Sequence, residues 1–586
     1  MPIDLISVLQ SHPCISLVEQ IATDEISDGA VPSQSFRLHA HENGHDWKLI
    51  IHVRNTFPLE LPRISIQNAA NYSAMGHIDW QGDVCYIDKQ GLVYDYNRPQ
   101  DVLLECINEV LGTLNENFND PLKIELNNDF KSYWESIPSS GFKTTCFVTA
   151  GENAKELIAY RDNKNQRKAK RTTCFAIVEE NHDIVNYYYL ISTLRGKKTE
   201  KSIYIPLHKP VLPPSPKQAW KASDLVNVLE ISTTNAVKES AFEIIGKQKW
   251  STYFTIIFSH PRPDLGHIFW GVQFHRKDTA PHPLLDPKDD WEVSPILLSL
   301  HNRDHLLERS ANSANLDKKK VVIIGCGSVG SGIAVQLAKA GIGELCLIDF
   351  DKMEVENIYR HTLGATALNT ETDGLYKTDA LRFQIESDIP YTRVINHKDH
   401  LLNLLASNKI FNLFDAIVVA TGDFTSELVF NKTHKIYENI SKIVPVIYAW
   451  QDGFGIGGHS ICVSNNKTSG CLECLYTGEN GFVAHPKTSF IKYGQTISKH
   501  MGGCSGVFTP YSFLDASQTA LLATRMTLDA LQGNAVNEIR SWKGGNEQLK
   551  AEGHSASIWY EKSPEHFIKD NREYIAPNCS VCGKYN

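Results

Sequence analysis

One stretch, KKVVIIGCGSVGSGIAVQLAKAGIGELCLIDFD (319–351), constrains the fold more than any other. The apolar run VVII predicts a buried strand, a glycine turn leads into a helix, and a second strand ends in acid, an order typical of a parallel βαβ unit. Gly325, Gly327 and Gly330 form the G-x-G-x-x-G turn, where the backbone can approach a phosphate at a helix N-terminus. Asp349 lies where a carboxylate can hold ribose hydroxyls. The stretch therefore predicts a Rossmann-like nucleotide site, for either NAD or ATP.

The length and charge limit what the rest of the chain can be. At 586 residues the chain exceeds one ordinary core, and its length suggests about three or four domains. A net charge of −9 argues against a nucleic-acid-binding surface over the whole molecule. We expect no membrane span, because no uninterrupted apolar run reaches the roughly 18–20 residues that a membrane helix needs, and the N-terminus does not resemble a signal peptide. Thiols stay reduced in a large chain that is not exported. We therefore expect the thirteen cysteines to be reduced and the protein to be cytoplasmic.

The N-terminal region predicts strands, a loop that contains Cys85, and a helix. SFRLHAHENGHDWKLIIHVRNTFP (35–58) alternates like two strands around a glycine-containing turn. RPQDVLLECINEVLGTLNE (98–116) carries apolar residues at helical spacing, and Pro99 suits the first turn. The predicted apolar face consists of Val102, Leu103, Ile107, Val110, Leu111 and Leu114.

The middle region predicts further strands but carries no catalytic constellation. Strand-like runs are TCFAIVEE (173–180), YFTIIFSH (253–260) and IFWGVQFH (268–275), while the proline-rich HKPVLPPSPK (208–217) predicts a loop or linker.

Two C-x-x-C pairs, separated by 104 residues, predict a metal site. Cys471 and Cys474 form the first pair, and Cys579 and Cys582 form the second. Four thiolates in two pairs match tetrahedral Zn²⁺, and such a closed site leaves no open coordination position, so its role would be structural. The alternative is a set of buried cysteines without metal.

LIDFDKMEVENIYRH (347–361) closely resembles the DxD…NxxR segment of the activating-enzyme family that includes ThiF, MoeB and the ubiquitin-activating enzymes. HNRDHL (301–306), GLYKTDAL (374–381) and VVATGDFTSELVFN (418–431) match further segments of that family in the same order. The resemblance implies that the nucleotide is ATP and that the enzyme adenylates the C-terminal carboxylate of a protein. The nicotinamide-dependent oxidoreductase, which uses similar glycines, stays the alternative.

The resemblance also implies roles for individual residues. Asp349 would hold the ribose, Asn357, Arg360 and Lys377 would surround the triphosphate, and Asp423 would hold Mg²⁺. Positive groups suit this chemistry, because charge accumulates on the attacked phosphate. The full set implied to bind ATP is Gly325, Gly327, Gly330, Asp349, Asp351, Asn357, Arg360 and Lys377.

By the same resemblance, Arg303 would reach into the site of a partner subunit in a homodimer, and a cysteine on a loop across the nucleotide site would attack the acyl-adenylate. Cys504, in KHMGGCSGVFTP (499–510), is the best candidate, because it follows the first cysteine pair and precedes a long helix. A thiolate on such a glycine-rich segment can act as the nucleophile. The alternative is that Cys504 is a small buried apolar residue.

Cys85 has a second resemblance. FPLELPRISI (57–66) resembles the YPxxPP strand turn of ubiquitin-conjugating enzymes, and GHIDWQGDVCYID (76–88) resembles their cysteine loop. The resemblance implies that Cys85 receives the acyl group as a thioester and passes it to an amine. The His-Pro-Asn element of that family is missing; His77, eight residues before Cys85, is the candidate for stabilising the oxyanion. The alternatives are an inert loop cysteine and a non-catalytic adaptor.

Together these features predict a multidomain α/β and α+β chain. We expect a ubiquitin-conjugating-like α+β domain over residues 1–142, a middle mixed domain over 143–300, and a Rossmann-like ThiF-type adenylation domain with the zinc site over 301–586. This order resembles the bacterial fusion proteins of CBASS antiphage operons. That resemblance implies that the donor is the C-terminus of a cGAS-like nucleotidyltransferase and the acceptor an amine of another protein. A separate ubiquitin-like protein or sulfur carrier stays the alternative donor.

Overall fold

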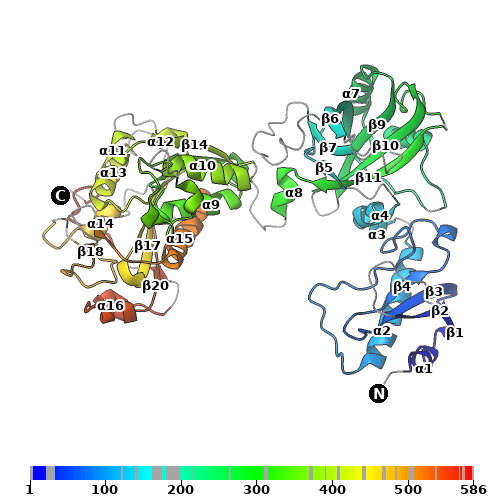
Figure 1. Cartoon of the computed structure of the whole chain (residues 1–586), viewed down its shortest axis with the longest axis horizontal. Coiled ribbons are helices and arrows are strands. Elements are labelled where there is room, and N and C mark those ends of the chain that lie inside the picture. Colours follow the sequence, from blue (N-terminus) through cyan, green and yellow to red (C-terminus); the bar gives the residue numbers. More distant parts are fainter. Residues whose placement is uncertain are drawn as a thin grey trace. The chain divides into compact units, whose positions relative to one another are not determined.

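The structure of the chain, a computed structural model, consists of two units (Figure 1). The described residues up to Leu306 form the first unit, and those from Leu307 onward form the second. The structure describes residues 4–21, 33–120, 123–138, 143–161, 174–179, 198–215, 217–262, 266–288, 290–308, 315–368, 374–389, 391–404, 410–437, 444–464, 470–481, 483, 485–500, 507–534, 537–565, 568–570 and 574–583.

The first unit begins with an α+β domain in which helices cover an antiparallel sheet. The strand order is β1-β2-β3-β4, and Asn43 and Gly44 between β2 and β3 have φ angles of 51° and 82°. Positive φ at both positions is typical of a type I′ hairpin, so the predicted pair of strands around a glycine turn is confirmed. The elements are α1 (Leu5–Gln10), β1 (Ile15–Ile21), β2 (Ser33–Glu42), β3 (His45–Arg54), β4 (Arg63–Ile66) and α2 (Pro99–Phe118).

Helix α2 packs on this sheet with the apolar face that the sequence predicts. Pro99 is its first residue, a position where the missing N–H of proline is not needed. The predicted apolar residues are all buried in one cluster with Phe36 and Leu49 of the sheet. The long loop between β4 and α2, which carries Cys85, is therefore held at both ends by elements of the same core.

The next strands close into a barrel in the order β10-β11-β5-β7-β6-β8-β9. The described residues of the three apolar runs of the middle region lie in β7, β9 and β10, which confirms that these residues form strands. The proline-rich segment lies between β8 and α6 in the sequence. The elements are β5 (Lys143–Cys146), β6 (Lys155–Arg161), β7 (Cys174–Glu179), β8 (Lys198–Pro206), α6 (Ala222–Ser232), α7 (Asn235–Gly246), β9 (Ser251–Arg262), β10 (Gly266–Ala280), β11 (Glu292–Leu300) and α8 (Arg303–Glu308).

Two short helices, α3 (Ile124–Asn128) and α4 (Phe130–Ser136), join the sheet to the barrel. In Figure 1 they lie between β1–β4 and the barrel strands. Phe130 and Trp134 are buried in the same cluster as Trp270 of β10. The first unit therefore has a shared core at this junction, while the domain boundaries at residues 142 and 300 stay predictions.

The second unit is built on a sheet with the order β14-β13-β12-β15-β16-β17-β20-β21. The strands from β14 to β16 are parallel, and β17, β20 and β21 continue the sheet in antiparallel pairs. The strands are β12 (Lys320–Ile324), β13 (Glu344–Ile348), β14 (Arg393–His397), β15 (Ala416–Val419), β16 (Val446–Gln451), β17 (Gly457–Val463), β20 (Ile539–Lys543) and β21 (Ile568–Asp570). The predicted parallel βαβ unit is β12, α9 (Ser328–Lys339) and β13.

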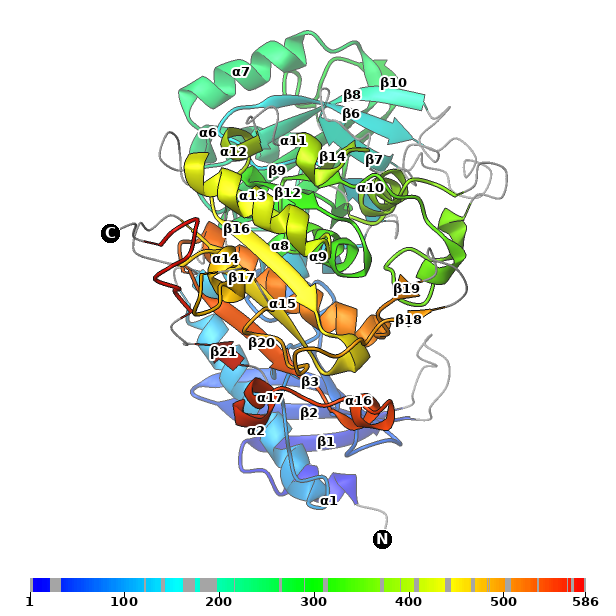
Figure 2. The ribbon, with the colours of Figure 1, turned by 90° about the vertical axis from the view of Figure 1, so that its left-hand side faces the viewer.

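Helices cover both faces of this sheet (Figure 2). Helices α9, α10 and α15 pack on one face, and α13 and α14 pack on the other. Both faces of β12 are thus buried, as its uninterrupted apolar sequence requires. The helices are α9 (Ser328–Lys339), α10 (Lys377–Asp388), α11 (Leu401–Leu404), α12 (Ile410–Leu413), α13 (Phe424–Tyr437), α14 (Leu472–Tyr476), α15 (Phe513–Leu531), α16 (Glu547–Ala551) and α17 (Ile558–Lys562), and a short hairpin pairs β18 (Lys499–His500) with β19 (Val507–Phe508).

Among the residues that the structure describes, no helix combines the length and the apolar character needed to cross a membrane.

Gly112 offers a test of α2. It lies in the middle of the helix, and a Cβ added there would have no neighbouring atom within 4 Å. Because alanine favours a helix interior over glycine by about 0.5–1 kcal/mol, Gly112→Ala should slow hydrogen exchange of the α2 amides by about two- to fivefold. Faster exchange in the full-length variant would contradict this packing.

Candidate active site

A cavity of about 220 Å³ opens at the carboxyl ends of β12, β13 and β15. In open parallel sheets this edge is where ligands bind. The cavity brings together most of the residues predicted to bind the nucleotide, from segments up to a hundred positions apart. The predicted residues in its lining are Gly325, Gly327, Asp349, Asp351, Lys377 and Asp423.

The glycines of the turn have different tasks. Gly325 has a φ of 88°, and a Cβ there would lie 2.5 Å from the carbonyl oxygen of Ala420. A Cβ on Gly330 would lie 1.8 Å from the oxygen of Gly325, so Gly330 allows α9 to pack against the turn. Gly327, the N-cap of α9, has open space around its Cβ position. The N-terminus of α9 is thus left accessible to an anion.

Asp349 is fixed at the end of β13 by its own backbone surroundings. Its Oδ2 accepts a hydrogen bond from the N–H of Cys326 at 2.7 Å, and its Oδ1 accepts one from the N–H of Asp351 at 2.8 Å. Burial raises the pKa of Asp349, and these two N–H donors act against that rise. Beside it, Nζ of the buried Lys377 lies 2.8 Å from Oδ2 of Asp351. One lysine charge is thus held in the wall of the cavity.

Asp423 also lines the cavity, directly before α13. Its carboxylate accepts hydrogen bonds from the N–H of Ser426, at 3.3 Å, and from the Ser426 hydroxyl. The hydroxyl is the main cause that lowers the pKa of Asp423. An exposed, ionised carboxylate is the ligand that Mg²⁺ prefers, so the side chain fits the predicted role.

Glu427, which sequence reasoning missed, holds the loop before Asp423. Its side chain is buried, and its Oε1 accepts from the hydroxyl and N–H of Thr421, at 2.8 and 3.1 Å, and from the N–H of Gly422, at 3.2 Å. Burial raises the pKa of Glu427 to about 7. The signal in the sequence was its spacing of four after Asp423, which places both residues on one side of α13.

Other predicted residues lie away from this cavity or outside the described ranges. Asn357 accepts from the N–H of Glu354 at 3.1 Å, and the guanidinium of Arg360 lies 5.5 Å from the ring centre of Tyr511. The Tyr511 hydroxyl donates to Oγ of Ser328 in the first turn of α9, at 3.3 Å. Arg360 is therefore near the turn, but its contact with a triphosphate stays a prediction, as does that of Asn357.

Arg303 is the first residue of α8, at the end of the first unit, so its predicted reach into a partner subunit stays a prediction. Cys504 lies outside the described residues. The long helix predicted to follow it is α15.

Cys85 is exposed on the loop between β4 and α2. Its N–H donates to the carbonyl oxygen of His77 at 2.7 Å, and Nε2 of His77 lies 3.3 Å from Oε2 of Glu125. Partial desolvation by the surrounding loop is the main cause that raises the pKa of Cys85, and the Asp129 carboxylate adds to it. The thiol is thus accessible but mostly protonated at neutral pH. The predicted oxyanion role of His77 stays a prediction.

The four cysteines of the two C-x-x-C pairs come together, as predicted. All their sulfur atoms lie within 4.8 Å of one another, with Cys471 and Cys579 3.8 Å apart and Cys474 and Cys582 3.2 Å apart. Tetrahedral zinc with four Zn–S bonds of about 2.3 Å places its sulfur atoms roughly 3.8 Å apart. The geometry fits Zn²⁺ held between the start of α14 and the C-terminal segment.

Replacing one thiolate tests the metal site. We expect Cys474→Ser to reduce the zinc bound per chain from about one ion to a small fraction, because three thiolates no longer close the tetrahedron. Elemental analysis of the purified protein measures this. Cys346→Ser, which changes a buried cysteine in β13, is the control and should keep the ion. Equal zinc in both variants would contradict the assignment.

Glu427 should make the stability of the second unit depend on pH. Its folded pKa, about 7, lies above the ordinary 4.5, so its contribution is fully present below pH 4.5 and is lost as the pH rises through 7, a change of about 3 kcal/mol. In the wild type, the free energy of unfolding should differ between pH 5 and pH 8, and in Glu427→Gln this difference should be lost. Hydrogen exchange of the β15 amides in urea measures the free energy of unfolding at each pH. Glu561→Gln, at an exposed position in α17, should keep the difference. An unchanged pH dependence in Glu427→Gln would contradict the expectation.

Known protein families match both the region that contains Cys85 and the region that contains the nucleotide cavity. The ThiF family matches residues 302–554, and prokaryotic E2 family B matches residues 16–142. The chain is 22% identical to the ATP-dependent ubiquitin transferase-like protein Cap2 of Pseudomonas aeruginosa, over 80% of this chain and 82% of that protein. It is 23% identical to the Escherichia coli protein of the same name, over 92% of each.

Among solved structures, E. coli MccB with ATP is 20% identical and covers 46% of this chain and 68% of its own, with a TM-score of 0.32. The ThiF match decides between the two nucleotide readings of the glycine turn in favour of an activating enzyme over an oxidoreductase. The chain is a fusion of a prokaryotic E2 family B domain with a ThiF family domain, and it is an ATP-dependent adenylylating and conjugating enzyme.

Proposed function

We propose that the chain adenylates the C-terminal carboxylate of a donor protein, carries the acyl group as a thioester on Cys504 and then on Cys85, and joins it to an amine. The observation that carries this proposal is the pairing, in one chain, of the ThiF-type cavity around Asp423 and Lys377 with an exposed cysteine on a conjugating-type loop. Either half alone would support only activation or only transfer.

The first step forms an acyl-adenylate. A carboxylate oxygen of the donor attacks the α-phosphate of ATP, the bond to the β-phosphate breaks, and pyrophosphate leaves. Two anions must approach each other, so the positive charge of Lys377 and the N–H groups at the start of α9 favour the reaction. Asp351 holds Lys377 in place. Mg²⁺ at Asp423 would add further neutralisation of the phosphate charge.

The next steps move the acyl group between sulfur atoms. The Cys504 sulfur attacks the acyl carbon, AMP leaves, and the thiol proton goes to solvent. Cys85 then attacks this thioester and releases Cys504 as a thiol, an exchange of one thioester for another that needs no further ATP. Finally an amine attacks the Cys85 thioester, an amide bond forms, and Cys85 is released as a thiol.

We further propose the setting of the reaction. The donor is the C-terminus of a cGAS-like nucleotidyltransferase, in antiphage defence, and the enzyme is a cytoplasmic homodimer in which Arg303 completes the partner's site. The similarity over most of the chain to the Cap2 proteins supports this setting. Zn²⁺ at the four cysteines would hold the C-terminal segment against α14.

Exchange of labelled pyrophosphate into ATP tests the first step. Exchange should require the donor protein, and Asp423→Asn should lower its rate by about a hundredfold or more.

A donor-dependent adduct that thiols cleave should form on the wild type, and Cys85→Ala should lose the final amide product while keeping the pyrophosphate exchange. Cys14→Ala, which alters a half-buried cysteine of the same domain, is the control.

Mass spectrometry of the product identifies the donor, since a separate ubiquitin-like protein and a nucleotidyltransferase tail differ in mass. Absence of exchange with every candidate donor would contradict the proposal. Product that persists in Cys504→Ala would show that another thiol takes the acyl group first.

A further inference from the structure

Helices α3 and α4 contact the cysteine loop, which is defined as residues 76–85. These two helices, with Asp129 between them and Ile137 after them, are called the bridging segment (124–137). One side of this segment contacts the cysteine loop, and the other side is buried in the barrel. No motif or cavity described above assigns a function to the barrel.

On the barrel side, aromatic rings anchor α4. Phe130 and Trp134 are 0% and 4% exposed. Their ring centres lie 5.8 and 5.0 Å from that of Trp270 in β10, and Trp134 also lies 5.6 Å from Trp220. Burying two large aromatic side chains stabilises a seven-residue helix that would not be stable alone. The position of α4 is therefore set by the barrel.

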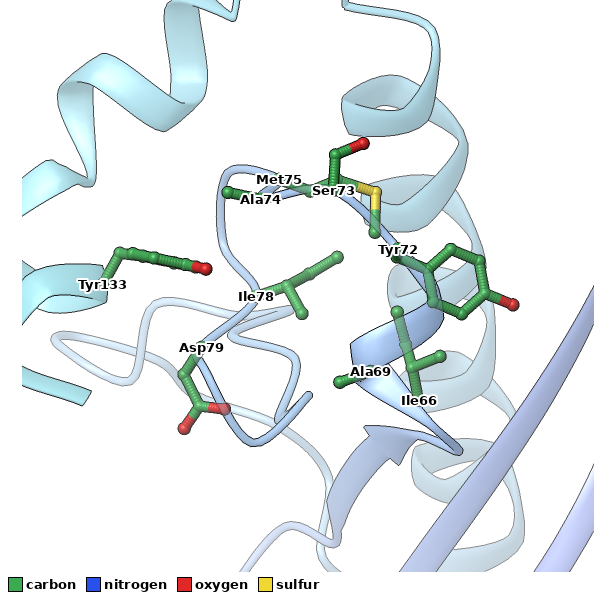
Figure 3. Close-up of a pocket in the computed structure, with 9 residues that line it drawn as sticks. All are labelled: Ile66, Ala69, Tyr72, Ser73, Ala74, Met75, Ile78, Asp79 and Tyr133. Carbon is green, nitrogen blue, oxygen red and sulfur yellow. The ribbon is translucent and has the colours of Figure 1, made fainter. Parts of the chain in front are cut away.

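On the loop side, α4 makes direct hydrogen bonds. The Ser136 hydroxyl accepts from the N–H of Trp80 at 2.8 Å, and the Ser136 carbonyl accepts from Nε2 of Gln81 at 3.0 Å. Figure 3 shows Tyr133 of α4 pointing toward the backbone that carries Ile78 and Asp79. The middle of the cysteine loop is thus bonded to a helix that the barrel anchors.

The start of the loop is held by α3 and the residue after it. His77 pairs with Glu125 at 3.3 Å, and the backbone N–H of His77 acts against the rise that burial causes in the pKa of Asp129. A Cβ on Gly76 would lie 2.7 Å from Cβ of Glu125, so the backbone of the loop closely approaches α3. His77 in turn accepts the N–H of Cys85 through its carbonyl oxygen. The contacts run without a gap from Trp270 in the barrel to Cys85.

From these contacts we propose that the barrel is a positioning domain. Through the bridging segment it fixes the cysteine loop in the conformation in which the Cys85 thioester is attacked, with Ser136 as a positioning residue. The inference rests on the proposed function, and it assigns the middle of the chain a task in that function. An exposed thiol on a long loop otherwise lacks the fixed geometry that attack by an amine requires.

Ser136→Ala tests the coupling with a small change. It leaves the N–H of Trp80 without its acceptor, and Ser136→Thr restores the hydroxyl. Ser240→Ala is the matched control, since Ser240 is also a half-buried helical serine, donates to a carbonyl in its own helix at 3.1 Å, and lies in α7 on the barrel. In the full-length protein, hydrogen exchange of residues 76–85 should become about three- to tenfold faster in Ser136→Ala alone.

The functional readout is the single-turnover discharge of the Cys85 thioester to an added amine. Ser136→Ala should lower the rate constant at saturating amine by about three- to tenfold, with the half-saturating amine concentration and the pyrophosphate exchange unchanged. Ser136→Thr should recover most of the rate. Two results for Ser136→Ala would overturn the inference. One is faster hydrogen exchange of residues 76–85 without a slower discharge of the thioester; the other is no change in either quantity.

The two proposals fail in different ways. If the wild type never carries a thioester on Cys85, the proposed function fails, and the positioning role fails with it even where hydrogen exchange shows the coupling. If the wild type carries and discharges the thioester but Ser136→Ala behaves like Ser240→Ala, only the positioning role fails.

Discussion

The close contact between Gly325 and the backbone of Ala420 is the constraint on which the nucleotide cavity depends. It joins the turn after β12 to the loop after β15, so the N-terminus of α9 and the carboxylate of Asp423 face the same space. Any side chain at Gly325 would separate the two loops, because a Cβ there would be 2.5 Å from the Ala420 oxygen. Glu427 secures the second loop by accepting hydrogen bonds from Thr421 and Gly422. A sheet edge becomes a defined cavity only when both loops are held.

Ionisable groups of the same type differ in exposure and pKa because their surroundings differ. Asp423 is exposed and hydrogen-bonded, so its pKa is lowered and it carries its charge at neutral pH. Burial acts in the opposite direction on Glu427, which serves as an acceptor within the fold. The cysteines differ in the same way: the clustered thiols of the two C-x-x-C pairs suit a metal ion, while Cys85 lies at the surface beside an acidic group. Residue type alone does not make these distinctions.

The elements that the sequence predicted well are those whose signal is local. The Asn43-Gly44 turn, the apolar face of α2 and the βαβ unit at Gly325 each depend on residues close together in the chain. Closure of the barrel depends instead on the pairing of β5 with β11, which lie about 150 residues apart. The two-sided α4 was missed for the same reason, because its partners come from other segments; the partners of the buried Glu427 are local, Thr421 and Gly422, and only its spacing after Asp423 marks it. Nothing local in the sequence shows that Phe130 and Trp134 pack against Trp270 of the barrel.

Acyl transfer makes two demands on Cys85 that conflict. In the proposed relay the sulfur must be open to the thioester on Cys504 and to the amine, yet the Cys85 thioester must keep a fixed orientation while the amine attacks. Exposed loops rarely supply that order by themselves, because few of their atoms are packed. Here the loop is open on the side of the sulfur and bonded on its other side, through Trp80 and His77, to helices whose aromatic residues are buried elsewhere. In the proposed positioning role, the order that the loop needs comes from the core in which Phe130 and Trp134 are buried with Trp270, which gives the barrel a task in the transfer.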